Sequence, residues 1–337
     1  MDKMAVCGLE VSARELVVAM VGKPVQRAAN SAAGHRRLLA ILTRGGKRVR
    51  VVMEATGMYG LDVALVLSAA AGVEVMVANP RSVRDFAKAM MQRSKNDPLD
   101  AQVLREYGER TPFRAWQRPS KNRLALWSIA RRIEALTAQS RAEKNRRHAA
   151  GISQVTPACV RRDIARNLEW LQRSLGKLRQ EARKCIAAEA ELQRKFQLLV
   201  SVPGIAENSA LQILGELAML PGDRDIRQWV AYAGLDPTEY RSGESVRRQS
   251  RLSRAGNRHL RTALYMPALA ALRCEPHLRG FYQQLVGRGK RKMQALLAVT
   301  RKLLHAIYGM FRNDRMYQGR LVFQLPSFAP ATLAAKN

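Results

Sequence analysis

Apolar residues in the first third of the chain occur in short alternating or continuous runs, which are typical of β-strands. Four segments show this pattern: residues 4–11, 15–21, 48–54 and 73–78. Helical spacing of apolar residues appears between and after them, over about 35–44, 60–71 and 82–91. The order β-β-α-β-α-β-α predicts an α/β domain with a mixed sheet.

The strand pattern stops at about residue 119, and apolar positions then step by three and four. The stepping positions are Leu126, Ile129, Ile133, Leu136, Ile164, Leu168, Leu171, Leu175, Leu178 and Ala182, and then Leu192, Phe196 and Leu199. We expect two long helices, broken near 151–157, that form either an antiparallel hairpin or an intermolecular coiled coil. The excess of basic residues in this stretch suggests that its outer face also touches phosphates.

A Pro203-Gly204 turn separates two apolar helical runs after this region. It resembles a helix-hairpin-helix element, whose backbone N–H groups can hold a DNA phosphate without reading sequence. Turns of this kind also join helices that bind nothing, so both readings stay open. An arginine-rich loop is expected next, followed by helices at about 256–274 and 291–312 and a Pro/Ala-rich tail.

The charge of the chain narrows the choice of partners. There are 58 Lys and Arg residues against 27 Asp and Glu, a formal net charge of +31 over 337 residues. Such a charge opposes a compact state unless a polyanion neutralises it, so nucleic acid is the expected partner. No apolar run reaches the roughly 18 residues of a spanning helix, and strand-like sequence at the N-terminus argues against a signal peptide.

Cysteine usage indicates a reducing compartment. The four cysteines are far apart in the sequence and form no C-x-x-C pair: Cys7, Cys159, Cys185 and Cys274. We therefore expect reduced, mostly buried thiols in a cytosolic protein, with neither a zinc site nor a disulfide framework.

Two acids stand close together at a predicted helix start. Pro98 suits the first helical position, so Asp97 is expected to cap the helix, and Asp100 falls three residues later on the same face. In so basic a chain the two carboxylates are candidate ligands for a hard cation that meets a phosphate. The alternative is that Asp97 only caps the helix and Asp100 only complements its dipole.

Two more acids follow predicted strands. Glu10 is near the end of the first strand, and Glu54 ends a central strand. Active sites of open α/β sheets lie at strand ends, so Glu10 and Glu54 are expected to converge with Asp97 and Asp100. Oxygen ligands suit Mg²⁺ or Mn²⁺, and two such ions roughly 4 Å apart can clamp both oxygens of a phosphodiester displacement. Taken singly, Glu54 can equally be a solvent-facing acid and Glu10 an ordinary edge residue.

The arginine-rich region also offers a nucleophile. Ser242 precedes a glycine there, so a backbone phosphate can approach it closely. Seven arginines occur between residues 241 and 261 and can stabilise transition-state charge: Arg241, Arg247, Arg248, Arg251, Arg254, Arg258 and Arg261. Serine is a weak nucleophile unless it or its target is activated, and a Ser-Gly pair is more often simply a turn.

Several motifs occur together in a fixed order. They are GLEVS at 8–12, MEATG at 53–57, KNDPLDA at 95–101, PGI at 203–205, AGLDP at 233–237 and SG at 242–243. The ordered set, which spans residues 4 to about 275, resembles the DEDD transposases of the insertion-sequence one-ten and eleven-eleven group, which are related to the Piv invertases. The set is far more specific than any single motif.

This resemblance implies an α/β RuvC-like (RNase H fold) N-terminal domain and a mostly α C-terminal transposase domain, joined by a long helical coiled coil. The expected boundaries are 1–112, 113–199 and 200–322, with a flexible tail at 323–337. Glu54, Asp97 and Asp100 match the second to fourth acids of the tetrad, and Ser242 matches the nucleophilic serine. Glu10 stands where the family pattern has Asp.

The resemblance also implies the partners. It points to a recombinase that acts on target and donor DNA, is guided by a structured non-coding bridge RNA, and uses Mg²⁺ or Mn²⁺. A homodimer that pairs into a homotetramer is expected, in the bacterial cytoplasm at the nucleoid and not at a membrane. The expected nucleic-acid contacts are Pro203, Gly204, Arg241, Arg247, Arg248, Arg251, Arg254 and Arg258.

Two other functions remain open at this point. The same fold can serve a metal-dependent junction nuclease, with water as nucleophile and Ser242 structural. Alternatively, Glu10 marks a decayed site in a protein that only binds DNA or RNA.

Overall fold

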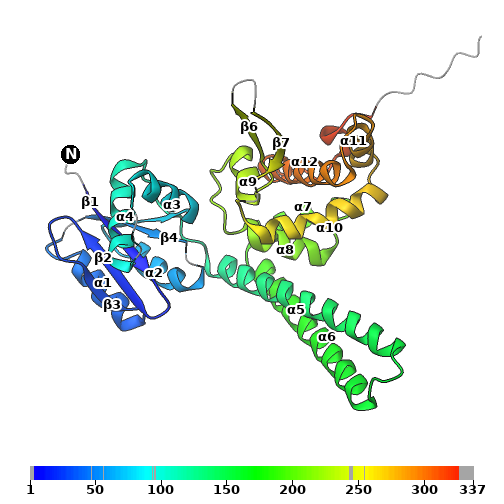
Figure 1. Ribbon diagram of the computed structural model, residues 1–337, viewed down its shortest axis with the longest axis horizontal. Helices are drawn as coiled ribbons and strands as arrows, with labels where there is room; N and C mark the ends of the chain where they lie inside the picture. Colours follow the sequence, from blue (N-terminus) through cyan, green and yellow to red (C-terminus); the bar gives the residue numbers. More distant parts are fainter. Residues whose placement is uncertain are drawn as a thin grey trace, which may run out of the picture. The chain divides into compact units, whose positions relative to one another are not determined.

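The computed structural model describes residues 4–46, 48–55, 57–92, 94, 96–242, 246–253 and 255–325, without the side chains of residues 58, 238–242 and 246–251. The chain divides into two compact units, Met1–Arg118 and Pro119–Asn337. The first unit carries a five-stranded sheet, and the second is mostly helical (Figure 1).

The sheet of the first unit is mixed, as the sequence predicts. Its strands are β1 (Ala5–Val11), β2 (Glu15–Met20), β3 (Gln26–Ala29), β4 (Val49–Glu54) and β5 (Val73–Ala78). They lie in the order β3-β2-β1-β4-β5. The β3–β2 and β2–β1 pairs are antiparallel, and the β1–β4 and β4–β5 pairs are parallel. The sequence pattern did not predict the edge strand β3.

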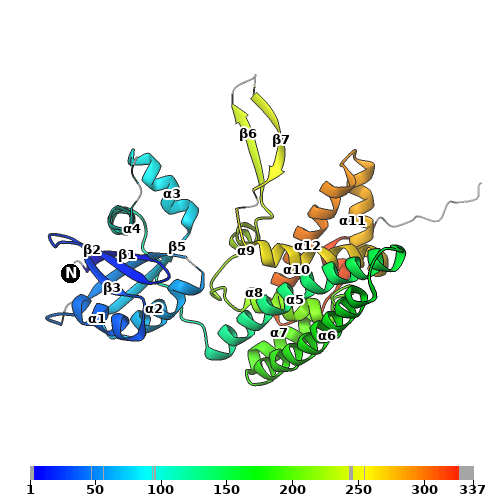
Figure 2. The same ribbon diagram turned by 60° about the horizontal axis from the view of Figure 1, so that its bottom comes forward.

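Helices cover both faces of this sheet. They are α1 (Ala32–Leu42), α2 (Met58–Ser68), α3 (Pro80–Ala89) and α4 (Asp97–Arg110). Figure 2 shows α1 and α2 on one face and α3 and α4 on the other. Alternation along the strands produces two cores: Leu9 and Met53 pack with α1 and α2, and Val52 packs with Leu104 of α4.

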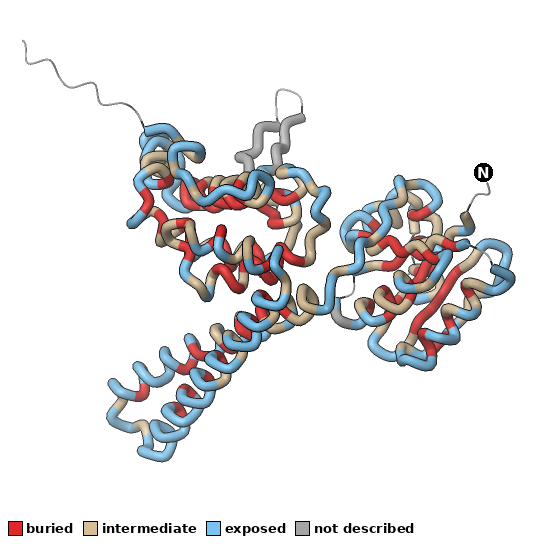
Figure 3. Tube along the Cα trace, turned by 180° about the vertical axis from the view of Figure 1, so that it is seen from behind, coloured by how far each residue is buried: buried red, intermediate tan, exposed pale blue. Residues whose placement is uncertain are grey.

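The second unit begins with two long helices, α5 (Lys121–Ile152) and α6 (Ala158–Ala187), which confirm the predicted break near 151–157. They pack as an antiparallel hairpin through Ile133, Leu136, Leu171 and Leu175. The outer turns of the hairpin are largely exposed (Figure 3). A coiled coil between chains stays a prediction.

The remaining helices form the largest core of the protein. They are α7 (Ala190–Val200), α8 (Glu207–Leu217), α9 (Ile226–Ala233), α10 (Arg258–Cys274), α11 (Pro276–Gly287), α12 (Lys292–Asn313) and α13 (Gly319–Val322). Helix α7 does not continue the hairpin as the stepping pattern suggested. Its Leu192, Leu198 and Leu199 are buried in this core instead, because the chain breaks at Ala188 and Glu189 and turns inward.

Strands β6 (Pro237–Ser242) and β7 (Val246–Leu252) form an antiparallel pair where the sequence predicted a loop. Apolar and polar residues do not alternate regularly in this segment, so its sequence lacks the usual strand pattern. Its Thr, Tyr and Val residues do favour extended backbone. The expectation that Ser242 lies in an arginine-rich loop is therefore wrong, because Ser242 is the last residue of β6.

Candidate active site and nucleic-acid interface

Glu10 and Glu54 end up beside each other at the carboxyl ends of two parallel strands. Leu9 of β1 pairs with Met53 of β4, so the next residues on each strand are Glu10 and Glu54. Leu9 and Met53 are buried in the core below the sheet, and alternation turns both glutamates to the opposite face, where they are half-buried. Both acids have an interaction partner in the structure.

Helix α4 lies on the same face as these glutamates and is held there by two glycines. A Cβ on Gly8 would come within 1.9 Å of the Ala101 carbonyl oxygen, and one on Gly108 within 2.4 Å of Val52 Cγ2. The start of α4 therefore lies toward Glu10 at the carboxyl end of β1, and its end lies toward Val6 and Val52. This direction places the first turn of α4, with Asp97 and Asp100, at the glutamate edge.

The cap of α4 differs from the expectation. Asn96, not Asp97, is the N-cap, and its side-chain oxygen accepts a hydrogen bond from the Leu99 N–H at 3.0 Å. Asp97 is the first residue of the helix instead, and it is exposed. Asn96 can take the N-cap position because it too is a strong N-cap residue. Pro98 then still lies within the first turn of the helix, where a proline needs no N–H donor.

The four acids therefore belong to elements that meet at one edge of the sheet, but they do not form a metal-binding cluster. Across the described ranges, no three His, Cys, Asp or Glu side chains are arranged to hold a metal ion. The donor set itself, four carboxylates, has the oxygen chemistry that Mg²⁺ and Mn²⁺ prefer. The donor set thus suits a divalent cation in its chemistry, whereas the described side chains are not arranged to hold one.

Ser242 lies in the other unit, at the end of β6. It pairs with Val246 in the last register position before residues 243–245, which fall outside the described residues. Where the hairpin leaves the helical body it is closed by Asp236 and Ser253: the Ser253 N–H donates to the Asp236 carbonyl at 3.0 Å, and its hydroxyl donates to Oδ1 at 2.5 Å. The hairpin is therefore anchored at its base, away from Ser242.

A polar cluster beneath the hairpin was not predicted from the sequence. Asn257 caps α10, and its side chain donates to Glu216 Oε2 at 2.6 Å and to the Tyr232 hydroxyl at 2.8 Å. Glu216 is 3% exposed and is also paired with Arg131 of α5. Burial raises the pKa of Tyr232 to about 12, so its hydroxyl stays protonated. This cluster links α5, α8, α9 and α10 at the base of the hairpin.

Only part of the predicted arginine set can be placed. Arg241 pairs with Arg247 across β6 and β7, Tyr240 pairs with Arg248, and Thr238 pairs with Arg251. Arg258 is exposed at the first position of α10, and the predicted Arg254 lies outside the described residues.

The Pro203-Gly204 turn does connect two helices, α7 and α8, as expected. Gly204 has φ +97, and a Cβ there would come within 2.7 Å of the Ala271 backbone nitrogen. The turn is therefore packed tightly on α10. Glu207 in the first turn of α8 pairs with Arg183, which places a carboxylate at the end where a phosphate would bind.

No helix in the described part of the chain is long and apolar enough to cross a membrane. The four acids and Ser242 belong to different units, and the structure does not relate the carboxylate edge to Ser242.

Comparisons with known proteins identify the family. A model described as Transposase matches residues 7–150, and a model described as Transposase IS116/IS110/IS902 family matches residues 196–283. The pilin gene-inverting protein of Moraxella bovis is 28% identical over 274 residues, which cover 81% of this chain and 83% of that protein. The corresponding Moraxella lacunata protein is also 28% identical, over the same shares.

A third relative is an insertion-element protein. The insertion element IS110 uncharacterized 43.6 kDa protein of Streptomyces coelicolor is 31% identical over 124 residues, 37% of this chain and 30% of that protein. The two family models follow one another along the chain and together match more than half of it. The chain therefore belongs to the IS116/IS110/IS902 family of transposases and is a DNA transposase or recombinase.

Proposed function

We propose that this transposase cuts and rejoins DNA with two groups of residues: carboxylates that bind Mg²⁺ or Mn²⁺, and Ser242 as nucleophile. The carboxylates are Glu10, Glu54, Asp97 and Asp100. The observation that carries the proposal is the adjacency of Glu10 and Glu54 at two parallel strand ends, beside the first turn of α4. The strand order β3-β2-β1-β4-β5 supports a RuvC-like (RNase H) fold for this unit.

In the proposed metal site, the fold of the protein positions the carboxylates relative to one another. Strand register fixes Glu10 next to Glu54, and the Gly8 contact fixes α4 above them. A bound divalent cation would neutralise charge on a phosphodiester and stabilise its transition state. Because the carboxylates do not yet converge, binding requires them to draw together.

The proposed covalent step uses Ser242. Its Oγ attacks the phosphorus of one DNA phosphodiester, the P–O bond to the leaving strand breaks, and a phosphoserine–DNA ester forms. The serine proton passes to solvent, and the leaving oxygen takes a proton to become a hydroxyl. In the second step, a hydroxyl end of another strand attacks the same phosphorus and releases the serine, so no bond energy is lost between cleavage and joining.

The basic surface is proposed to hold both nucleic acids. The Arg241–Arg247 pair on the hairpin and Arg258 at the start of α10 are near Ser242 in sequence and on the same supersecondary element or next to it. The net charge of +31 is large enough to serve DNA and also a structured non-coding guide RNA. Pilin gene inversion, named for the Moraxella relatives, is a DNA rearrangement compatible with the same chemistry.

Assembly follows from the separation of the two groups. The acids lie in one unit and Ser242 lies in the other. A complete active site can therefore combine the acids of one subunit with Ser242 of a second subunit, so we propose a homodimer that pairs into a homotetramer on two DNAs. Sedimentation of the protein with and without DNA containing the ends of its element tests this. A monomer on that DNA would contradict it.

The decisive test is detection of the covalent intermediate. Purified protein is incubated with radiolabelled DNA that carries the ends of its native element, with its co-expressed flanking RNA and Mg²⁺, and denatured products are separated. The wild type should retain label on the protein, and Ser242→Ala should abolish it. Ser153→Ala, which changes a serine at the end of α5, is the matched control and should leave labelling unchanged.

The same assay separates the rival functions. Strand cleavage that survives in Ser242→Ala would identify a junction nuclease that uses water. Glu10→Asp tests for a decayed site: under our proposal the wild type is active, and the Asp variant is active as well. Strand exchange in Glu10→Asp alone would show instead that the natural chain only binds nucleic acid.

A further inference from the structure

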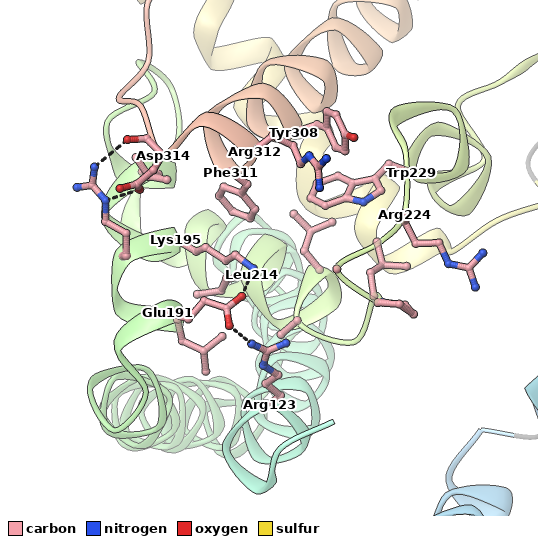
Figure 4. Close-up of a pocket in the computed structure, with 18 residues that line it drawn as sticks. Arg123, Glu191, Lys195, Leu214, Arg224, Trp229, Tyr308, Phe311, Arg312 and Asp314 are labelled. Atoms are coloured by element: carbon pink, nitrogen blue, oxygen red, sulfur yellow. Dashed lines mark hydrogen bonds and ion pairs between the residues drawn. The ribbon is translucent and has the colours of Figure 1, made fainter. Parts of the chain in front are cut away.

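The helical unit contains a pocket that no part of the proposed reaction uses. It has a volume of about 420 Å³ and lies between α7, α8, α9 and the end of α12, with Arg123 of α5 at its edge (Figure 4). This size is within the range of small-ligand pockets, roughly 300–1,000 Å³.

One wall of the pocket is aromatic. Tyr308 and Phe311 of α12 line it together with Trp229 of α9. The Trp229 ring meets Tyr308 edge-on at 5.3 Å and Phe311 at 6.1 Å between centroids, which fixes their orientations. Leu214 and Leu217 of α8 complete the apolar lining. Such a surface binds flat aromatic groups better than it binds water.

Some of the charges around the pocket are paired, and one of the paired cations, Lys195, also lies over the Phe311 ring, with its Nζ 5.5 Å from the ring centroid. Glu191 pairs with Arg123 and with Lys195, each at 2.5 Å, and Asp314 pairs with Arg194 at 2.6 Å. A hydrogen bond from Lys195 holds the pKa of Glu191 below its ordinary value, so this carboxyl stays ionised. Arg224 and Arg312, in contrast, are in no ion pair with any residue of the described chain.

These two cations also line the pocket. Figure 4 shows Arg312 next to Tyr308 and Trp229, and Arg224 past Trp229 with its side chain directed away from the other labelled residues. The pocket therefore offers flat apolar surface and unpaired positive charge next to each other. An anion with a flat aromatic body matches both features, and unpaired nucleotides are recognised by stacking on aromatic side chains with arginine at the phosphate.

We propose that this pocket holds one unpaired nucleotide of a nucleic-acid strand, with its base against Tyr308 and Phe311 and its phosphate at Arg224 and Arg312. The inference rests on the nucleic-acid binding proposed above, but it requires neither Ser242 nor the carboxylates. A nucleotide within a duplex cannot enter, because its base is covered on both faces; it must leave the stack first. The pocket therefore selects a bulge, a loop or a displaced strand.

The test compares two short DNA duplexes that are identical except for one bulged 2-aminopurine, whose fluorescence reports stacking. Wild-type protein should bind the bulged duplex about tenfold more tightly than the paired duplex, the order expected for one base that gains aromatic partners. Its 2-aminopurine fluorescence should fall on binding. The same bulge in an RNA duplex shows whether the natural strand is DNA or RNA.

The informative quantity in the variants is the preference ratio. Arg224→Ala combined with Arg312→Ala, and separately Phe311→Leu, should reduce the ratio to about one. Arg162→Ala combined with Arg173→Ala removes two exposed cations of α6, so it is the control for lost charge; it should weaken both duplexes equally and keep the ratio. Thermal unfolding verifies that each variant is folded. If Phe311→Leu is unfolded, the double arginine variant alone decides the test.

Three results would overturn the proposal. They are an equal affinity of the wild type for both duplexes, a preference that survives in both pocket variants, and a preference that the α6 control also removes. A wild type that binds neither duplex nor RNA at low salt would overturn the proposed nucleic-acid function as well. In the first three cases that function stands.

Discussion

The backbone of Ala101 leaves no room for a side chain at residue 8: its carbonyl oxygen would lie 1.9 Å from a Cβ on Gly8. This contact joins β1 to the helix that carries Asp97 and Asp100. Because glycine has no Cβ, α4 can pack this closely on β1 at the candidate metal site.

Replacing Gly8 by Ala should therefore displace α4. We expect a loss of about 1–3 kcal/mol in the free energy of unfolding, the usual cost of overpacking, and loss of strand transfer because two acids move. Urea unfolding and the transfer assay measure the two effects.

Gly176→Ala is the matched control for this change. Gly176 lies within α6 and a Cβ there meets nothing within 4 Å, so alanine should stabilise the helix by about 0.5–1 kcal/mol. A Gly8→Ala protein as stable and as active as the wild type would show that α4 does not pack on β1 as described.

Divalent cations should stabilise the folded protein through the carboxylate edge. Adding Mg²⁺ or Mn²⁺ at about 100 times Kd stabilises a protein by about 2.7 kcal/mol, which raises Tm, and chelation by EDTA should reverse it. Glu54→Gln should lose most of this rise, because one charged donor is gone. Differential scanning calorimetry with and without the metal measures it.

Asp85→Asn serves as the control because Asp85 is an exposed acid of α3 that pairs with Arg81 at 3.6 Å. It should show the same metal-dependent rise as the wild type. If Glu54→Gln and Asp85→Asn respond alike, the cation binds somewhere other than the proposed edge.

Glu216→Gln should weaken the cluster beneath the hairpin. The substitution leaves Arg131 and Asn257 facing a neutral amide, and breaking a buried pair costs about 3–5 kcal/mol. Because the Arg131 side chain is 31% exposed, water compensates part of this, and we expect a loss of about 1–3 kcal/mol in chemical denaturation.

An exposed ion pair provides the comparison. Arg166→Ala removes the pair with Asp163, whose side chains are 78% and 76% exposed, and should change stability by less than about 1 kcal/mol. Equal effects of Glu216→Gln and Arg166→Ala would mean that the cluster contributes no more than a surface pair.

Cys7 should be unreactive in the folded protein. Burial raises the pKa of its thiol from 9.0 to about 11, so little thiolate exists at pH 8, whereas Cys159 and Cys274 are exposed. A thiol reagent should modify these two and spare Cys7 until the protein unfolds, and peptide mapping shows which sites react.

The same shift has a consequence for stability. The Cys7 thiol has a higher pKa in the folded protein than in the unfolded chain. Its contribution to the free energy of unfolding is therefore complete below about pH 9 and is lost as the pH rises toward about 11, because between these values the thiol ionises in the unfolded chain but not in the folded protein. Cys7→Ala should flatten this alkaline decline. A decline that is identical in the variant would assign it to another group.

The sequence predicted the elements whose apolar pattern is strong. Strands β1, β2, β4 and β5 and the break between α5 and α6 appear where the pattern placed them, because each buries a regular apolar face. Strand β3, with the sequence Gln-Arg-Ala-Ala, and the polar β6–β7 pair carry no such pattern. Their pairing partners, and not their own residues, make them strands.

The candidate site was predictable to the same extent. Glu10 and Glu54 could be placed at strand ends from local pattern alone, and parallel pairing then brings them together. The cap at Asn96 could not be separated from one at Asp97, since both residues suit that position. Glu216 and Asn257 are 41 residues apart, and nothing local in the sequence indicates that such residues meet.

The hairpin of α5 and α6 makes most of its outer apolar contacts with itself. Ala150, Ile164 and Leu168 form one small cluster near the tip, separate from the core that α7, α8, α10 and α12 share. Adding or removing matching turns on both helices would leave that core untouched. The length of the hairpin can therefore change independently of the rest of the fold. That length sets the distance between a partner bound at the hairpin tip and one bound at the helical core.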